Sequence, residues 1–137
     1  MDVSTLRVAA SAAIHVKNAA GEPLYDGGSG KPVRIIVHSP GSRAYAAVES
    51  RQTARSLKRM NENEGKITAP SVEERLAETA EDLAAVTIRF ENLTHGDKQG
   101  TDLFEAVYGD PELGFITRQV NRFLADWGNF KAGSAAS

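Results

Sequence analysis

The first third of the chain alternates short β-type runs with turns. In 13–17, apolar and polar residues alternate with the period of two expected of a half-buried strand. A second run rich in β-branched residues, 33–38, stops at Ser39-Pro40-Gly41, where proline and glycine disfavour further pairing. Residues 18–30 are rich in glycine and predict a turn-rich connection. We therefore expect two paired strands, preceded by a lead-in at 1–12.

Helical spacing replaces this pattern from Ser42, a plausible N-cap. The helix predicted over 42–60 has few large apolar residues, and such a thin stripe indicates contact on one side only. Ser71 and Glu74 then form a capping box, the clearest helix start in the chain. From there, apolar residues recur at steps of three and four as far as Leu93, which predicts one long amphipathic helix.

Two shorter helices are predicted near the C-terminus. Thr101 is expected to cap the first, and Gly109 to end it. Asp110-Pro111 starts the second, with aspartate as N-cap and proline at the first position, where its missing N–H does no harm. The apolar face of this last helix is expected to comprise Leu113, Ile116, Val120, Phe123, Leu124 and Trp127.

This order of elements predicts an α+β fold: a small N-terminal antiparallel β-hairpin or sheet followed by three to four helices. The 137 residues correspond to one domain. We assign it to 13–130, between the lead-in at 1–12 and a flexible tail at 131–137. The hydrophobic fraction of 41% is ordinary for a globular protein, and no stretch nears the roughly 20 apolar residues of a membrane span. No membrane contact is expected.

Charge is nearly balanced over the whole chain, with a net value of -2, so there is no general attraction to nucleic acid. The predicted helix at 42–60 is nevertheless locally basic, whereas the one that starts at Ser71 is acidic. Complementary pairing of these helices, or a solvated surface, is favoured over nucleic-acid binding. The basic residues are Arg43, Arg51, Arg55, Lys58 and Arg59.

The sequence offers no converging set of catalytic groups. Cysteine is absent, and the three histidines lack the spacing of a metal site, although His15 and His38 could meet if they were cross-strand neighbours. The run from Gly27 to Lys31 departs from the phosphate-loop spacing, and no helix directly follows it. Ser39, Ser42 and Ser50 have neither a triad arrangement nor a nucleophile-elbow pattern around them. We therefore expect no catalytic residue, no cofactor and no metal, and a protein that is not an enzyme.

Aromatic residues gather close to the C-terminus. Each such ring buries a large apolar area, and most of the group is expected to lie in the core. Aromatic side chains are also enriched at binding hot spots, so the same group is the candidate partner-binding or oligomer contact. Its members are Phe115, Phe123, Trp127 and Phe130.

The order of segments over 13–130 resembles the tail assembly chaperones of long-tailed (siphovirus-type) bacteriophages and prophages. The likeness lies in the turn Gly21-Glu22-Pro23-Leu24, in the strand that leads into Ser39-Pro40-Gly41-Ser42, and in three later segments. These are Thr87-Ile88-Arg89-Phe90-Glu91-Asn92-Leu93, the run from Leu103 to Pro111, and the ending Phe115 to Val120 followed by Asp126-Trp127-Gly128-Asn129-Phe130. Family members often have Trp where this chain has Phe90.

The resemblance implies a protein without an active site that acts during virion morphogenesis in the cytoplasm of the bacterial host. It would bind the tape measure protein, keep it soluble and help recruit tail tube protein around it, and it would be absent from the finished virion. A homo-oligomer is possible. The alternatives are a structural subunit of a phage tail or other assembly, and a small nucleic-acid-binding regulator that uses the basic surface at 51–59.

Overall fold

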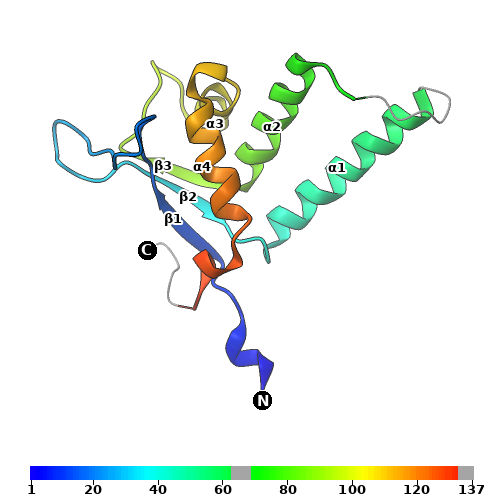
Figure 1. Ribbon diagram of the computed structural model, residues 1–137, viewed down its shortest axis with the longest axis horizontal. Helices are drawn as coiled ribbons and strands as arrows, with labels where there is room; N and C mark the ends of the chain where they lie inside the picture. Colours follow the sequence, from blue (N-terminus) through cyan, green and yellow to red (C-terminus); the bar gives the residue numbers. More distant parts are fainter. Residues whose placement is uncertain (63–68, 133–137) are drawn as a thin grey trace.

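The computed structural model describes residues 1–62 and 69–132. It has the predicted α+β architecture: a three-stranded antiparallel sheet, ordered β1-β2-β3, with helices packed above one face (Figure 1). The predicted linker at 61–70 and the predicted tail at 131–137 fall largely outside the described residues. The elements in chain order are η1 (Val3–Leu6), β1 (Ser11–His15), β2 (Arg34–His38), α1 (Arg43–Glu62), α2 (Val72–Val86), β3 (Thr87–Glu91), α3 (Gly100–Tyr108), η2 (Pro111–Leu113), α4 (Gly114–Leu124) and η3 (Trp127–Phe130).

The predicted N-terminal hairpin is confirmed. β1 and β2 are antiparallel, with Ser11 opposite His38 and His15 opposite Arg34. β1 begins two residues before the predicted start, so Ser11 and Ala12 belong to the strand rather than to the lead-in. Ala12, Ile14 and Val16 are all buried, as the alternation along this run predicts.

The third strand corrects the prediction of one helix from Ser71 to Leu93. α2 ends at Val86, Thr87 has extended backbone angles, and β3 pairs antiparallel with β2. The apolar spacing of Thr87 and Phe90 continues the helical pattern, yet it also fits a strand that is half-buried on a sheet. The even-numbered residues of β2 have backbone groups that point away from β1, and pairing with β3 satisfies them.

The helix starts follow local chemistry with one exception. The Ser42 hydroxyl accepts a hydrogen bond from Tyr45 N at 3.2 Å, and the Ser71 hydroxyl accepts one from Glu74 N at 3.1 Å, so both predicted caps are confirmed. Asp110 caps the short turn η2 through Glu112 N, and α4 follows. Thr101 is not the cap predicted for α3, because the helix begins at Gly100 after an uncapped Gln99.

The core lies between the sheet and α2, α3 and α4. Tyr108 and Phe130 are the largest fully buried side chains. The Thr87 hydroxyl donates to Leu83 O at 2.7 Å and lies 2.7 Å from the Tyr108 hydroxyl, so the one polar atom of the Tyr108 ring is satisfied. Burial raises the pKa of Tyr108 well above its ordinary value.

The opposite face of the sheet is covered by charged side chains rather than by a helix. Arg34 pairs with Glu91 at 2.6 Å, and Arg89 contacts the same carboxylate at 2.9 Å. Ile36 lies on this face between the strands and is fully buried. The hydrogen bond from Arg34, reinforced by Arg89, outweighs burial and lowers the pKa of Glu91.

Helix α1 stands apart from this body. It leaves the sheet beside β2 and diverges from α2, so the two helices form a V (Figure 1). Val48 is the only buried residue among its 20 residues. The thin apolar stripe predicted for this helix is therefore matched by sparse apolar contact, and other forces must hold it in place.

Candidate protein-binding groove

The four aromatic residues proposed as a partner site do not share one surface. Phe130 is fully buried, and its ring meets that of Phe123 edge-on with centroids 5.3 Å apart. Phe115 and Phe123 are half-buried against the core. Only Trp127 is largely exposed, at 55%, and it lies in η3 beyond the end of α4, not on the predicted apolar face of that helix. Phe130 therefore has no surface to offer a partner.

Trp127 packs against the turn that precedes α1. A Cβ built on Gly41 would lie 3.5 Å from Trp127 Cζ3 and 3.4 Å from a methyl group of Val8, so a larger side chain would crowd the indole. The exposed ring is thus held next to the first turn of α1. An aromatic ring fixed in this way can contact a partner with little loss of conformational freedom.

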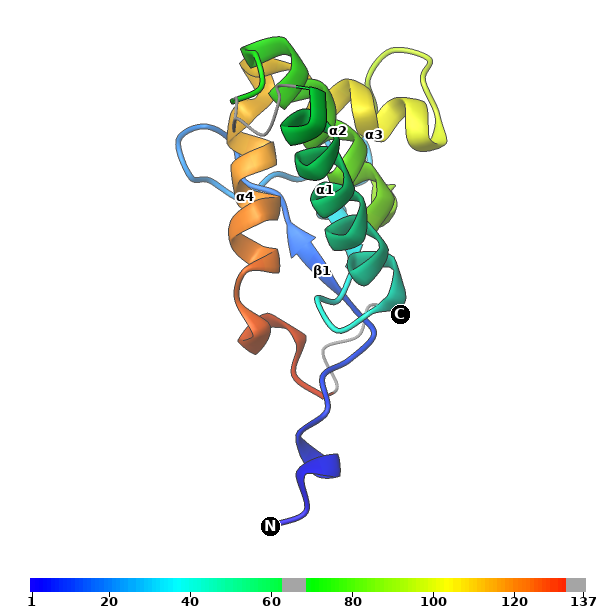
Figure 2. The same cartoon turned by 90° about the vertical axis from the view of Figure 1, so that its right-hand side faces the viewer.

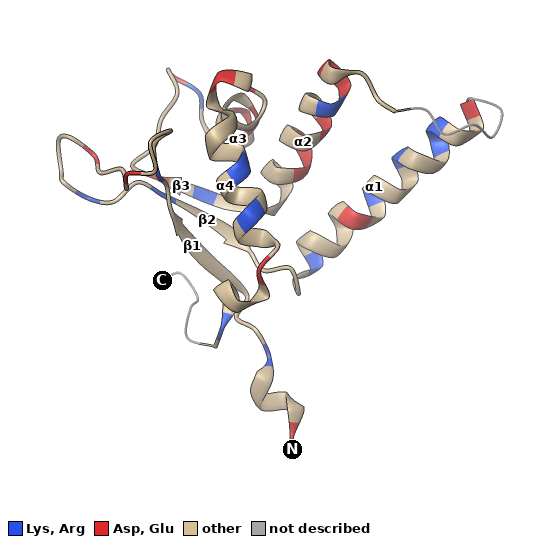
Figure 3. Ribbon diagram, viewed as in Figure 1, with Lys and Arg blue, Asp and Glu red and all other residues tan. Residues whose placement is uncertain are grey.

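An ionic ladder, defined as Arg51, Arg55 and Arg59 of α1 with Glu74, Glu78, Glu81 and Asp82 of α2, joins the two arms of the V. The arginines recur every four residues and so share one side of α1. Arg51 reaches Glu81 and Asp82 near the base, whereas Arg59 reaches Glu78 and Glu74 near the tip. The predicted pairing of the basic and acidic helices is confirmed (Figure 3).

Asp82 is the centre of this ladder. Its carboxylate accepts two hydrogen bonds from Arg55 at 2.9 Å, one from Arg51 at 3.1 Å and one from the Gln52 amide at 3.0 Å. The residue is only 8% exposed, which would be costly for an unpaired charge. Burial works against the charge on Arg55, but the hydrogen bond to Asp82 and the carboxylates of Glu81 and Glu78 raise its pKa overall.

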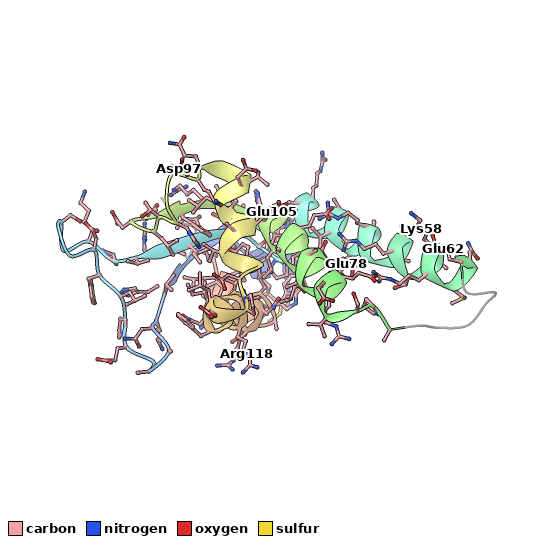
Figure 4. All side chains as sticks on the ribbon, turned by 90° about the horizontal axis from the view of Figure 1, so that it is seen from above. Lys58, Glu62, Glu78, Asp97, Glu105 and Arg118 are labelled. Atoms are coloured by element: carbon pink, nitrogen blue, oxygen red, sulfur yellow. The ribbon has the colours of Figure 1, made fainter. Side chains whose placement is uncertain are left out.

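The ladder is confined to one side of α1. Figure 4 shows Glu78 between α2 and α1, whereas Lys58 extends from the opposite side of α1. Three of the arginines expected to form a basic surface, Arg51, Arg55 and Arg59, are therefore paired with carboxylates of α2. Since apolar contacts between α1 and the body centre on Val48, charge pairing carries much of the attachment of this helix.

A groove runs between α1, α2 and α4, with a cavity volume of about 220 Å³. Asp82 and Gln52 of the ladder line one part of it. The other side chains that face it include Asn121, whereas Trp127 follows the lining residue Ala125 by two positions and does not itself line the groove. Its apolar lining comes from Tyr45, Val48, Leu83, Val86 and Leu124.

The sequence prediction missed this groove. Leu83, Val86 and Leu124 have the helical spacing of core residues, and they are indeed buried. What the pattern could not show is that α1 diverges and leaves part of their surface open. The one available signal was the sparse apolar stripe of α1, because a helix with so few large apolar residues cannot close over its neighbour.

The three histidines do not come together in the structure. The strand register places Ser11, not His15, opposite His38, so the two histidines lie four positions apart along the sheet. His15 Nε2 is 2.9 Å from Leu24 O, and its ring meets Tyr25 edge-on. His95 lies 4.0 Å from Asp110. Within residues 1–62 and 69–132, no group of three or more His, Asp or Glu side chains could hold a metal ion.

Comparison with known proteins gives no relative. No known family, no characterised protein and no solved structure matches this chain. Of the helices that the structure describes, none combines the length and the apolar character needed to cross a membrane. The groove and its chemistry must therefore carry the functional argument together with the resemblance of the sequence pattern.

Proposed function

We propose that this chain is a tail assembly chaperone of a long-tailed bacteriophage, which binds the tape measure protein and helps recruit tail tube protein in the cytoplasm of the bacterial host. In this proposal the protein acts by transient binding, without catalysis and without a cofactor. The observation that carries it is the groove between α1, α2 and α4, a cavity with both apolar and polar lining, flanked by a helix that is attached largely by charge.

The groove suits an amphipathic helix as client. Its lining combines apolar side chains with polar groups from Asn121, Gln52 and Asp82. A tape measure protein, as the resemblance implies, is long and helical and has apolar surface to cover before assembly. The exposed Trp127 ring, which lies against the turn before α1, would extend the contact. Because α1 has little apolar packing of its own, we expect it to adjust to the client as long as the ion pairs of the ladder are kept.

The structure bears differently on the two alternatives. A nucleic-acid regulator would need Arg51, Arg55 and Arg59 free for phosphates, yet these side chains pair with carboxylates of α2. This disfavours that alternative. A structural subunit could use the same groove for permanent contacts, so the distinction depends on whether the protein remains in the finished particle.

The test is co-expression with the tape measure protein encoded beside its gene. We expect the two to co-purify and the client to become soluble. Asn121→Trp would fill the groove from an exposed position of α4 and would add no charge that could compete for Asp82, and Trp127→Ala would remove the exposed ring. Both should abolish or strongly reduce recovery of the client. The matched control is Tyr25→Ala, because Tyr25 is 60% exposed on the distant 18–32 connection.

Two outcomes would count against the proposal. If the variants retained the client as well as the unmodified chain, the groove would not be the binding site. If no interaction formed and the chain were instead recovered from purified particles, the structural-subunit alternative would replace the chaperone. Circular dichroism of each variant would show that the fold is intact.

A further inference from the structure

On the outer edge of β1, several backbone N–H and C=O groups have no hydrogen-bond partner among the described residues. Val16 N donates to Val33 O, and Ala10 O accepts from Ser39 N, so the even-numbered residues of this run pair toward β2. By the period of two, the N–H and C=O groups of Ser11, Ala13 and His15 point to the opposite edge. In the described part of the chain, no other backbone or side-chain group pairs with them.

This open stretch of edge is bounded at both ends. At one end Ala9 N donates to Phe130 O at 2.7 Å. At the other, the Gln119 amide accepts from Lys17 N and donates to Lys17 O, both at 2.7 Å, as a neighbouring strand would. Between these points lies a slot of about 440 Å³ beside α4, which we call the β1 slot. Ile14 and Phe123 give it apolar walls.

The charges of the β1 slot differ between its ends. Lys17 and Arg122 lie toward the Gln119 end, and neither takes part in an ion pair within the described residues. Asp126 lies toward the Phe130 end, where its carboxylate caps Gly128 N. The slot therefore favours an extended segment that carries a carboxylate where it meets Lys17 and an apolar side chain where it meets Phe123.

The N-terminal arm, residues 1–10, has that pattern. It extends away from the body (Figures 1 and 2), with Val3 71% and Leu6 63% exposed. Its single turn, η1, contains no buried residue and is capped by Asp2. Straightening the turn therefore breaks a local cap but loses no buried contact. In extended form Asp2 and Leu6 lie on the same side, because they are four residues apart.

The arm cannot occupy the slot of its own chain. It would have to reverse direction at Ala9 and Ala10 to run back along β1. Both residues are held in place there by hydrogen bonds, from Ala9 N to Phe130 O and from Ser39 N to Ala10 O. The slot is therefore accessible only to the arm of another molecule.

We propose that the N-terminal arm of a second copy of this chain binds in the β1 slot as a strand antiparallel to β1. Its backbone pairs with Ser11, Ala13 and His15, Leu6 packs on Ile14 and Phe123, and Asp2 meets Lys17 and Arg122. The parallel orientation would place Asp2 beside Asp126 and is disfavoured. Every copy offers one arm and one slot, so reciprocal exchange closes a dimer and sequential exchange builds a longer assembly.

The primary test is the mass of the full chain in solution, measured by light scattering after gel filtration over a range of concentrations. We expect self-association that is lost in Leu6→Asp, which leaves Ala9 and its hydrogen bond untouched, and in Ala13→Pro. Proline removes an outward N–H and is tolerated at an edge strand. Val72→Asp is the matched control, because Val72 is 70% exposed on α2 far from the slot and should still self-associate.

A labelled peptide of residues 1–10 tests the contact directly. It should bind the full-length Leu6→Asp variant, whose own arm no longer competes for the slot, and adding Arg122→Glu should weaken this binding about fivefold. A peptide with Asp2→Lys should recover affinity for that charge-reversed variant. A full chain that stays monomeric at every concentration, or peptide binding unchanged by Ala13→Pro, would overturn the proposal. No client is present in either assay, so the result is independent of the proposed function.

Discussion

Two helical interfaces in this protein are built in opposite ways. α2, α3 and α4 pack on the sheet through apolar side chains, with Val107, Tyr108 and Val120 buried almost completely. α1 meets α2 through the ionic ladder and buries only Val48. Apolar packing is close and insensitive to salt, whereas exposed ion pairs weaken as salt screens them. The body is therefore expected to be rigid, and α1 to be the adjustable part.

The largest effect is expected from the apolar side of this comparison. Phe130→Ala removes a fully buried ring that packs on Phe123, and should lower the free energy of unfolding by about 3–5 kcal/mol. Urea denaturation followed by circular dichroism measures it. A loss of unfolding free energy below about 1 kcal/mol would contradict the placement of this ring in the core. Phe130 would then again be a candidate for partner binding.

Asp82→Ala tests the ionic side. It leaves Arg55 and Arg51 without their most buried partner, and the expected loss is on the order of 3 kcal/mol. Hydrogen exchange should show the increase in exchange chiefly in α1, with the amides of β2 and α3 less affected. If hydrogen exchange became faster to the same extent throughout the protein, α1 and the body would unfold as one unit. The distinction between the two interfaces would then be lost.

Tyr108→Phe examines the polar contact inside the apolar core. It removes the hydroxyl that meets Thr87, and should lower stability by about 1 kcal/mol. The pKa of Tyr108 is raised by burial, so its stabilising contribution is complete below the unfolded-state pKa of about 10 and decreases as pH rises above that value. Thermal melts in this alkaline range should decline less steeply for the variant than for the parent chain.

The smallest effect is expected at the solvent side of the ladder. Glu81 has half of its side chain exposed, and its oxygens lie 3.1 Å from Arg55 Nη2 and 3.5 Å from Arg51 Nε. Glu81→Gln should lower stability by less than about 1 kcal/mol, and the difference from the parent should shrink at high salt. A loss as large as that of Asp82→Ala would show that burial does not decide the strength of these pairs.

Several features of the fold could be predicted from local sequence because local chemistry decides them. The caps at Ser42 and Ser71 depend on a hydroxyl and the backbone N–H three residues on, and both formed as expected. The alternation in 13–17 placed Ile14 and Val16 in the core. Opposite charge on two neighbouring helices predicted the ladder, although not that Asp82 would be its buried centre.

Other features required contacts that lie far apart in the sequence. The helical spacing through Leu93 was a wrong guide at Thr87, because the free edge of β2 needed backbone partners and the β-branched pair Thr87-Ile88 could supply them. Phe130 and Trp127 are three residues apart and equally apolar, yet one is fully buried and the other exposed. The way in which η3 packs against β1 decides which of these two rings is buried.

The sequence by itself thus determined the α+β class, the positions of most helix starts, the hairpin and the complementary charges of α1 and α2. These depend on periodicity, capping and composition, which act over a few residues. Only the tertiary structure decided the third strand, the groove beside α1 and the open edge of β1. Each of these arises from how much surface one element leaves uncovered on another, and that quantity depends on the packing angle of whole elements rather than on any local pattern.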